Sequence, residues 1–168
     1  MHDPKHQRPG AALKNPSALA VIDTNVVLDW LVFDDPRVRE LGHSLVQGQM
    51  RWLATEAMLA ELADVLGRPA IAKHCPDLAA TMACARSRCR VVSDRITQHN
   101  PAPRCADPDD QMFIDLAWST PTGWLFSRDR ALLELARPAL VRDLRITTPA
   151  LWPGLDQTPH QAGVKKAA

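Results

Sequence analysis

The sequence lacks long apolar segments. Its apolar runs end within about ten residues, at Asp23, Asp34 and Asp129, far short of the roughly 20 residues that a membrane-spanning helix needs. The N-terminus, MHDPKHQRPG, is polar and contains no apolar core of a signal peptide. We therefore expect no membrane span and a cytoplasmic location.

The cysteines, glycines and histidines are too scattered to form common cofactor motifs. Cys75, Cys84, Cys89 and Cys105 contain no CxxC pair, so a zinc site is not indicated and reduced thiols are expected. The seven glycines are isolated and form no GxGxxG or GK[ST] loop for nucleotide phosphates. None of the six histidines stands in a pattern that indicates a general base.

Neither sign of charge dominates the chain. Twenty basic and 19 acidic side chains give a formal net charge of +1, which excludes a uniformly basic protein that coats nucleic acid. Both ends of the chain are slightly basic, and the segment 18–152 carries a net charge of −2. Acidic side chains are therefore expected to gather somewhere within this segment.

The 168 residues, of which 46% are hydrophobic, suffice for one domain. We predict that domain over 18–152, between flexible tails at 1–17 and 153–168. Short apolar runs predict strands at 19–22, 52–54, 91–92, 124–126 and 141–146. Helices are predicted at 36–48, 55–66, 77–89, 107–119 and 130–137. This alternation predicts an α/β fold with a central parallel sheet that helices cover on both faces.

Carboxylates follow or lie near the predicted strands. Asp23 directly follows the first strand, Asp129 follows the strand at 124–126, and Glu61 lies at the margin of the buried face of its helix. Each could alone be a cap or turn residue or a solvated acid. The carboxyl ends of parallel strands share one edge of the sheet, however, so we expect the acids to converge. Clustered carboxylates bind a cation or take up protons, and oxygen ligands suit Mg²⁺ or Mn²⁺.

Three more acids surround Pro108, where a helix is predicted to begin. Asp107 before Pro108 is a typical helix cap, so its role is expected to be structural and supporting. From this helical register, Asp110 shares the buried face that carries Phe113, Ile114 and Ala117, whereas Asp109 points to one side. Asp110 is therefore expected to reach the shared edge, and Asp115 is expected to be solvated.

These short motifs, in this order, resemble the PIN-domain family, and within it the VapC-like toxins of bacterial toxin–antitoxin pairs. The resemblance spans about 19–152. It rests on Asp23-Thr24-Asn25, Glu61-Leu62, Asp107-Pro108-Asp109-Asp110, Phe126-Ser127-Arg128-Asp129 and Ile146-Thr147-Thr148-Pro149. Arg128 departs from the family pattern, which commonly has a small or polar residue at that position.

The resemblance implies a three-layer α/β/α sandwich that cuts RNA with Mg²⁺ or Mn²⁺. The family's catalytic and metal-binding quartet maps onto Asp23, Glu61, Asp110 and Asp129, with Asn25 and Ser127 as polar supports. A metal-activated water would then attack the phosphate in line and leave a 5′-phosphate and a 3′-hydroxyl. The alternative is a PIN fold that binds RNA or a partner without cutting.

The resemblance further implies a cognate antitoxin as partner. Trp30 and its apolar neighbours either offer a surface for a partner helix or a second copy of the chain, or pack into the core; these neighbours are Val27, Leu28, Leu31 and Val32. Several arginines either contact RNA phosphates or lie on solvated surfaces: Arg86, Arg88, Arg90, Arg95, Arg128 and Arg130.

Overall fold

A computed structural model of the chain describes residues 18–93 and 101–155. The predicted N-terminal tail, most of the predicted C-terminal tail and Arg95 lie outside these residues. The described residues form one parallel sheet in the strand order β3-β2-β1-β4-β5. Its strands are β1 (Ala18–Ile22), β2 (Met50–Ala54), β3 (Cys89–Val91), β4 (Trp124–Phe126) and β5 (Arg145–Thr147).

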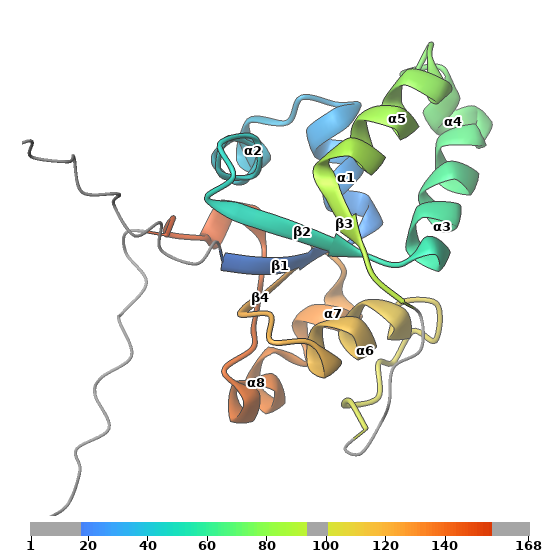
Figure 1. The fold of residues 1–168 in the computed structure, drawn as a ribbon. Helices are drawn as coiled ribbons and strands as arrows, with labels where there is room; N and C mark the ends of the chain where they lie inside the picture. Colours follow the sequence, from blue (N-terminus) through green and yellow to red (C-terminus); the bar gives the residue numbers. More distant parts are fainter. Residues whose placement is uncertain (1–17, 94–100, 156–168) are drawn as a thin grey trace, which may run out of the picture.

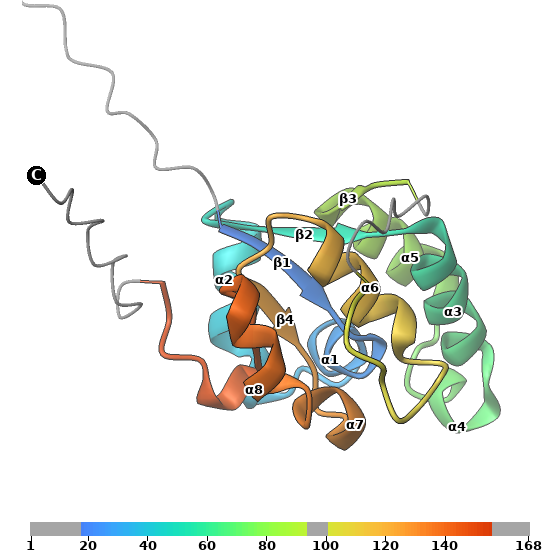
Figure 2. The ribbon, with the colours of Figure 1, turned by 90° about the horizontal axis from the view of Figure 1, so that it is seen from below.

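Helices cover both faces of the sheet, as Figure 1 shows from the side and Figure 2 from below. One face carries α1 (Thr24–Leu31), α2 (Arg39–Val46), α3 (Glu56–Gly67), α4 (Pro69–Ala72) and α5 (Leu78–Arg88). The other face carries α6 (Gln111–Ser119), α7 (Arg130–Leu133) and α8 (Ala136–Ala139). Short 3₁₀ turns span Pro36–Val38, Leu140–Arg142 and Pro149–Leu151. The expected three-layer α/β/α sandwich is confirmed.

The first strand lies at the centre of the sheet, between β2 and β4. Ile22 at the end of β1 lies opposite Phe126 at the end of β4. The residues that follow these two strands, Asp23 and Ser127, therefore emerge side by side at the carboxyl edge. The direction in which strands are added reverses at β1 and β4, and open α/β sheets bind ligands at such a switch point.

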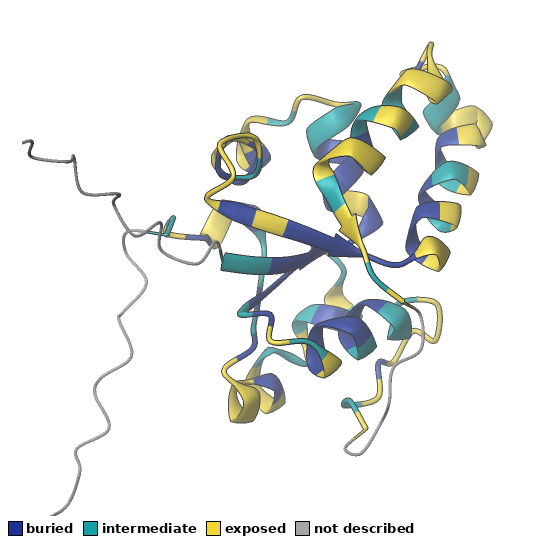
Figure 3. Cartoon of the chain, viewed as in Figure 1, coloured by how far each residue is buried: buried dark blue, intermediate teal, exposed yellow. Residues whose placement is uncertain are grey.

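The core lies between the sheet and its two helical layers. Figure 3 shows buried residues concentrated along the strands and on the helix faces that turn toward them. Helix α6 packs on β1 and β4 and buries Phe113, Ile114 and Ala117. These are the three residues that the sequence placed on the buried face with Asp110. None of the helices in the described part of the chain has the length and apolar character that a membrane span requires.

The start of α6 differs from the prediction. The helix begins at Gln111, not at Asp107. The Asp107 carboxylate accepts a hydrogen bond from the backbone N–H of Asp109, over 3.0 Å, and this short turn competes with a helical start. Asp107 is therefore a turn residue here and does not cap α6.

Several other elements also differ from the prediction; the helix predicted at 130–137, for example, is divided into α7 and α8. The predicted last strand, 141–146, starts only at Arg145, since a 3₁₀ turn precedes it and Asp143 adopts a left-handed conformation, with φ of 56°. The helix α1 was not predicted from the sequence. It follows β1 without a loop, because Asp23 accepts from the backbone N–H of Asn25 and thereby caps it.

Candidate active site

Asp23 is held rigidly at the end of β1. Its side chain belongs to a residue that is only 2% exposed. Oδ2 accepts a hydrogen bond of 2.6 Å from the Ser127 hydroxyl, and Oδ1 lies 3.4 Å from the backbone N–H of Asn25. Burial raises the pKa of the Asp23 carboxyl above its ordinary value, and the nearby charge of Asp129 raises it further. The predicted support Asn25 is exposed and contributes its backbone.

Ser127 links the ends of β1 and β4. Besides donating to Asp23, its hydroxyl oxygen accepts from the backbone N–H of Asp129 over 2.8 Å. The Asp129 carboxylate in turn accepts from the backbone N–H of Ala131 over 2.7 Å and caps α7. Both Asp23 and Asp129 are thus helix caps, as the simpler interpretation expected. Capping and convergence occur together, because each cap lies at a strand end.

Asp110 reaches the same edge from the start of α6. It occupies the cap position of this helix, but its side chain makes no capping hydrogen bond. Burial raises the pKa of the Asp110 carboxyl from 3.8 to about 7, and the charges of Asp23, Asp129, Asp107 and Glu61 contribute in that order. The charges of acids from the ends of β1 and β4, from α3 and from the turn at Asp107 therefore all act on Asp110.

Glu61 faces the cluster from α3, on the opposite helical layer. Its Oε2 atom is buried and has no hydrogen-bond partner among the described residues. Burial raises the pKa of the Glu61 carboxyl; the adjacent Thr24 side chain lowers it in part, and the charge of Asp23 raises it. A buried carboxylate oxygen without a donor is costly, so a cation or a bound water would stabilise this position.

The four acids carry no compensating ion pair within the described residues. Their carboxylates do not converge on a single point. In the part of the chain that the structure describes, no three Asp, Glu, His or Cys side chains are placed so that they could hold a metal. Asp109 is exposed. Asp115 is half-buried and accepts from the Gln111 amide over 2.9 Å, so it is not simply solvated as predicted.

Arg128 forms an ion pair that sequence reasoning missed. Its guanidinium donates to Asp29 Oδ1 over 2.9 Å, and its Nε lies 2.6 Å from Oδ2. Asp29 lies on α1 and is buried. The pair ties the segment that carries Ser127 and Asp129 to the helix that begins after Asp23. The only sequence signal was the departure of Arg128 from the family pattern.

Most of the other candidate arginines contact protein groups. Arg86 pairs with Glu56 and Arg130 with Glu134, while the Arg88 guanidinium lies over the Trp30 ring.

The apolar stretch around Trp30 belongs mostly to the core. Val27 and Leu28 are buried, and Trp30, Leu31 and Val32 are half-buried against the core. Gly42 on α2 approaches the Trp30 indole so closely that an added Cβ would lie 2.5 Å from its Nε1. This favours core packing over a free surface.

The sequence profile described as PIN domain matches residues 19–131 and thus includes all four acids. The chain belongs to the PIN domain family. A solved structure of VapBC2 from Rickettsia felis, bound to a DNA fragment from their promoter, contains a chain of similar fold: the TM-score is 0.52 and the identity 11%, over 76% of this chain and 96% of that chain. None of the curated proteins matches the sequence. The resemblance to the PIN-domain family seen in the sequence is confirmed.

Proposed function

We propose that this PIN domain is a divalent-metal-dependent endoribonuclease and the toxin of a toxin–antitoxin pair. The observation that carries the proposal is the gathering of Asp23, Asp110 and Asp129 at the carboxyl edge of β1 and β4, where the charge of Asp129 raises the pKa of Asp23 and the charges of Asp23 and Asp129 raise the pKa of Asp110. Such repulsion costs stability unless it serves a ligand of positive charge. Membership in the PIN domain family supports a nuclease.

The chemistry of the donor set suits Mg²⁺ or Mn²⁺, and the four carboxylates would move closer together to hold the ion. Asp23, Asp110 and Asp129 would hold the ion from the edge of the sheet, and the unpartnered Glu61 oxygen would face it from α3. All these ligands are oxygens, and the open arrangement leaves room for the waters that Mg²⁺ keeps. A bound ion would lower the pKa of a water and neutralise charge on the scissile phosphate.

The chain's own residues determine how the acids are presented. Ser127 keeps one Asp23 oxygen in place, and the N–H of Ala131 does the same for Asp129. Asp110 has no such hydrogen bond from its own helix, so its carboxylate can turn to a ligand. A pKa of about 7 means that Asp110 must lose a proton before it can bind a cation.

The partners follow from the same charge pattern. The scissile phosphate of RNA would bind near the acids through the metal. An antitoxin segment that carries an Arg would instead form an ion pair with the carboxylates directly. The likeness to a chain of the VapBC2 structure supports an antitoxin partner. Co-expression with the adjacent reading frame, followed by pull-down, tests this partner; the failure of the two products to form a complex would count against the toxin role.

The cleavage test uses a 5′-labelled mixed RNA pool with Mn²⁺ or with EDTA. We expect wild-type protein to cut only with Mn²⁺, Asp110→Asn to be inactive while remaining folded, and Asp109→Asn to cut normally as the matched control, because Asp109 is exposed. An active Asp110→Asn with an inactive Asp109→Asn would overturn the site. A wild-type protein that binds RNA but never cuts would favour the non-catalytic alternative.

A further inference from the structure

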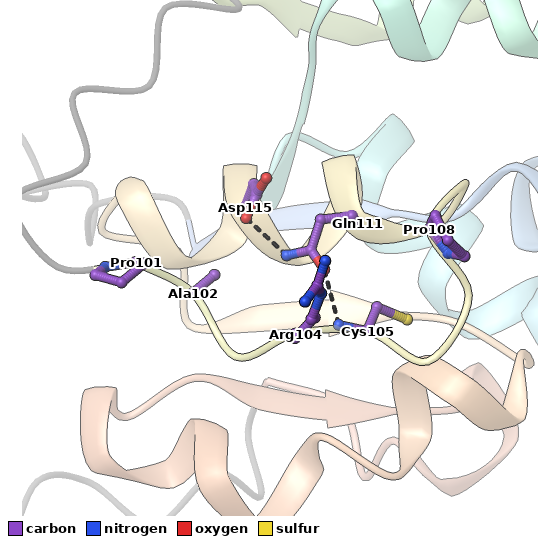
Figure 4. Close-up of a pocket in the computed structure, with 7 residues that line it drawn as sticks. All are labelled: Pro101, Ala102, Arg104, Cys105, Pro108, Gln111 and Asp115. Atoms are coloured by element: carbon purple, nitrogen blue, oxygen red, sulfur yellow. Dashed lines mark hydrogen bonds between the residues drawn. The ribbon is translucent and has the colours of Figure 1, made fainter.

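A cavity of about 430 Å³ lies between α6 and the segment before it. Figure 4 shows its lining: the segment that carries Pro101, Ala102, Arg104 and Cys105 runs along the helix, and Gln111 and Asp115 project from the helix toward it. The walls combine apolar groups with one guanidinium and one carboxylate. This size and composition are typical of small-ligand sites.

Gln111 holds the cavity in shape. Its amide nitrogen donates to Asp115 over 2.9 Å and to the Pro103 carbonyl over 3.3 Å, and its oxygen accepts from the Cys105 backbone N–H over 2.7 Å. Through these bonds the Gln111 side chain connects the segment before α6 to the helix and fixes the position of that side of the cavity. Hydrogen bonds within the fold therefore maintain the shape of the cavity.

Arg104 is available for a ligand. It is exposed, and it forms no ion pair or hydrogen bond with any residue in 18–93 or 101–155. Most other arginines near the proposed site are paired, such as Arg128 with Asp29. An unpaired guanidinium in the lining of a cavity is suited to a ligand that carries negative charge.

The cavity adjoins the acidic edge. Gln111 directly follows Asp110, and the Cys105 thiol, which lines the cavity, lies within reach of the charges of Asp110, Asp107 and Asp129. A strand of RNA that extends from the acids into the cavity would therefore pass along Cys105 and the start of α6.

We propose that this cavity binds the nucleotide next to the scissile phosphate of single-stranded RNA. This inference rests on the proposed nuclease function and names a subsite for its substrate. Arg104 contacts a phosphate, the base lies against the apolar wall formed by Pro101, Ala102 and Pro108, and Asp115 accepts from N–H groups of the base edge. A phosphate contact adds affinity for any sequence, whereas a base-edge contact adds a preference at one position.

The first test measures the affinity of the full chain for labelled eight-nucleotide homopolymers in EDTA, where cutting is not expected. We expect Arg104→Ala to weaken binding about tenfold for every sequence and to reduce the salt dependence. Arg39→Ala is the matched control, because Arg39 is exposed on α2, in the opposite helical layer. Equal affinities of the two variants, or the absence of RNA binding by wild-type protein, would overturn the proposal.

The second test compares the cleavage positions of Asp115→Asn and wild type in Mn²⁺. We expect a changed base preference at the position next to the cut, with little change in overall rate. If wild-type protein cuts RNA and Arg104→Ala cuts it with an unchanged KM, the subsite is wrong while the nuclease function stands. If the Arg104-dependent binding is found without any cutting, the nuclease function is wrong while the subsite stands.

Discussion

Charged side chains at the two ends of the sheet have different surroundings. At the amino end, the Arg145 guanidinium lies 5.2 Å from the Trp124 ring centre and that of Arg142 lies 5.0 Å from the Trp118 ring. At the carboxyl end, Asp23 and Asp110 face each other's charge with no ion pair to a described residue. Charge supports packing at the first end, whereas at the second the Arg128–Asp29 pair does so and the carboxylates of the proposed site remain available for a ligand.

This difference separates what stabilises the fold from what the site needs. Cations over aromatic rings add to stability, and the aromatic group is extended by Trp152, which packs edge-on against Phe126 with ring centres 5.5 Å apart. Unpaired acids subtract from stability until a cation is bound. We therefore expect loss of the Trp152 ring and loss of the Asp110 charge to change the free energy of unfolding in opposite directions.

The largest effect is expected from Trp152→Ala. This variant loses the ring contacts with Trp124 and Phe126 and leaves a void, so we expect the free energy of unfolding to fall by about 3–5 kcal/mol. Urea unfolding followed by circular dichroism measures it. Trp152→Phe is the control and should cost much less, because the indole nitrogen has no hydrogen-bond partner among the described residues. Equal losses in both variants would show that ring contact is not what matters.

The next effect concerns the ion pair between Arg128 and Asp29. Arg128→Ala leaves a carboxylate buried without its partner, and we expect the free energy of unfolding to fall by about 1–3 kcal/mol. Asp29→Asn should cost less, because the Arg128 side chain is 41% exposed and water can solvate it. Arg130→Ala, two residues along, should change little, since its pair with Glu134 is on the surface. An Arg128→Ala variant as stable as Arg130→Ala would contradict the structural role of the pair.

A smaller effect should appear as a pH dependence in EDTA. The pKa of Asp110 is about 7 in the folded protein against an ordinary 3.8, so the folded state holds the proton more tightly. Its contribution to stability is full below about pH 4 and is lost as the pH rises through 7. After allowance for solvent screening at this half-buried site, we expect a loss of about 1–2 kcal/mol. Asp110→Asn should remove this part of the pH profile and be the more stable protein at pH 8.

The strand ends and helix faces could be predicted from the sequence because they depend on local patterns. The continuous apolar run before Asp23 is typical of a buried strand, and the spacing of Phe113, Ile114 and Ala117 follows the period of a helix. The same patterns placed Asp110 on the buried face of its helix, and this face is the one that packs on β1 and β4.

Features that depend on distant residues could not be predicted. Arg128 and Asp29 are 99 positions apart, and no periodicity links them. The start of α6 was misplaced because an Asp before a Pro suits both a helix cap and a tight turn, and only the bond from the Asp109 N–H decides between them. Helix α1 was missed because it follows β1 with no loop between them, and Asp23, which ends the apolar run of the strand, also caps the helix.

The most direct measurement of the difference between the two ends is Mn²⁺ binding, followed by electron paramagnetic resonance of the free ion. We expect wild-type protein and Asp109→Asn to bind Mn²⁺ saturably with similar affinity, and Asp110→Asn to bind at least tenfold more weakly, because it removes the carboxylate at the centre of the cluster. Equal binding by Asp110→Asn and Asp109→Asn, or no saturable binding by wild-type protein, would contradict a cation site at the carboxyl edge of β1 and β4.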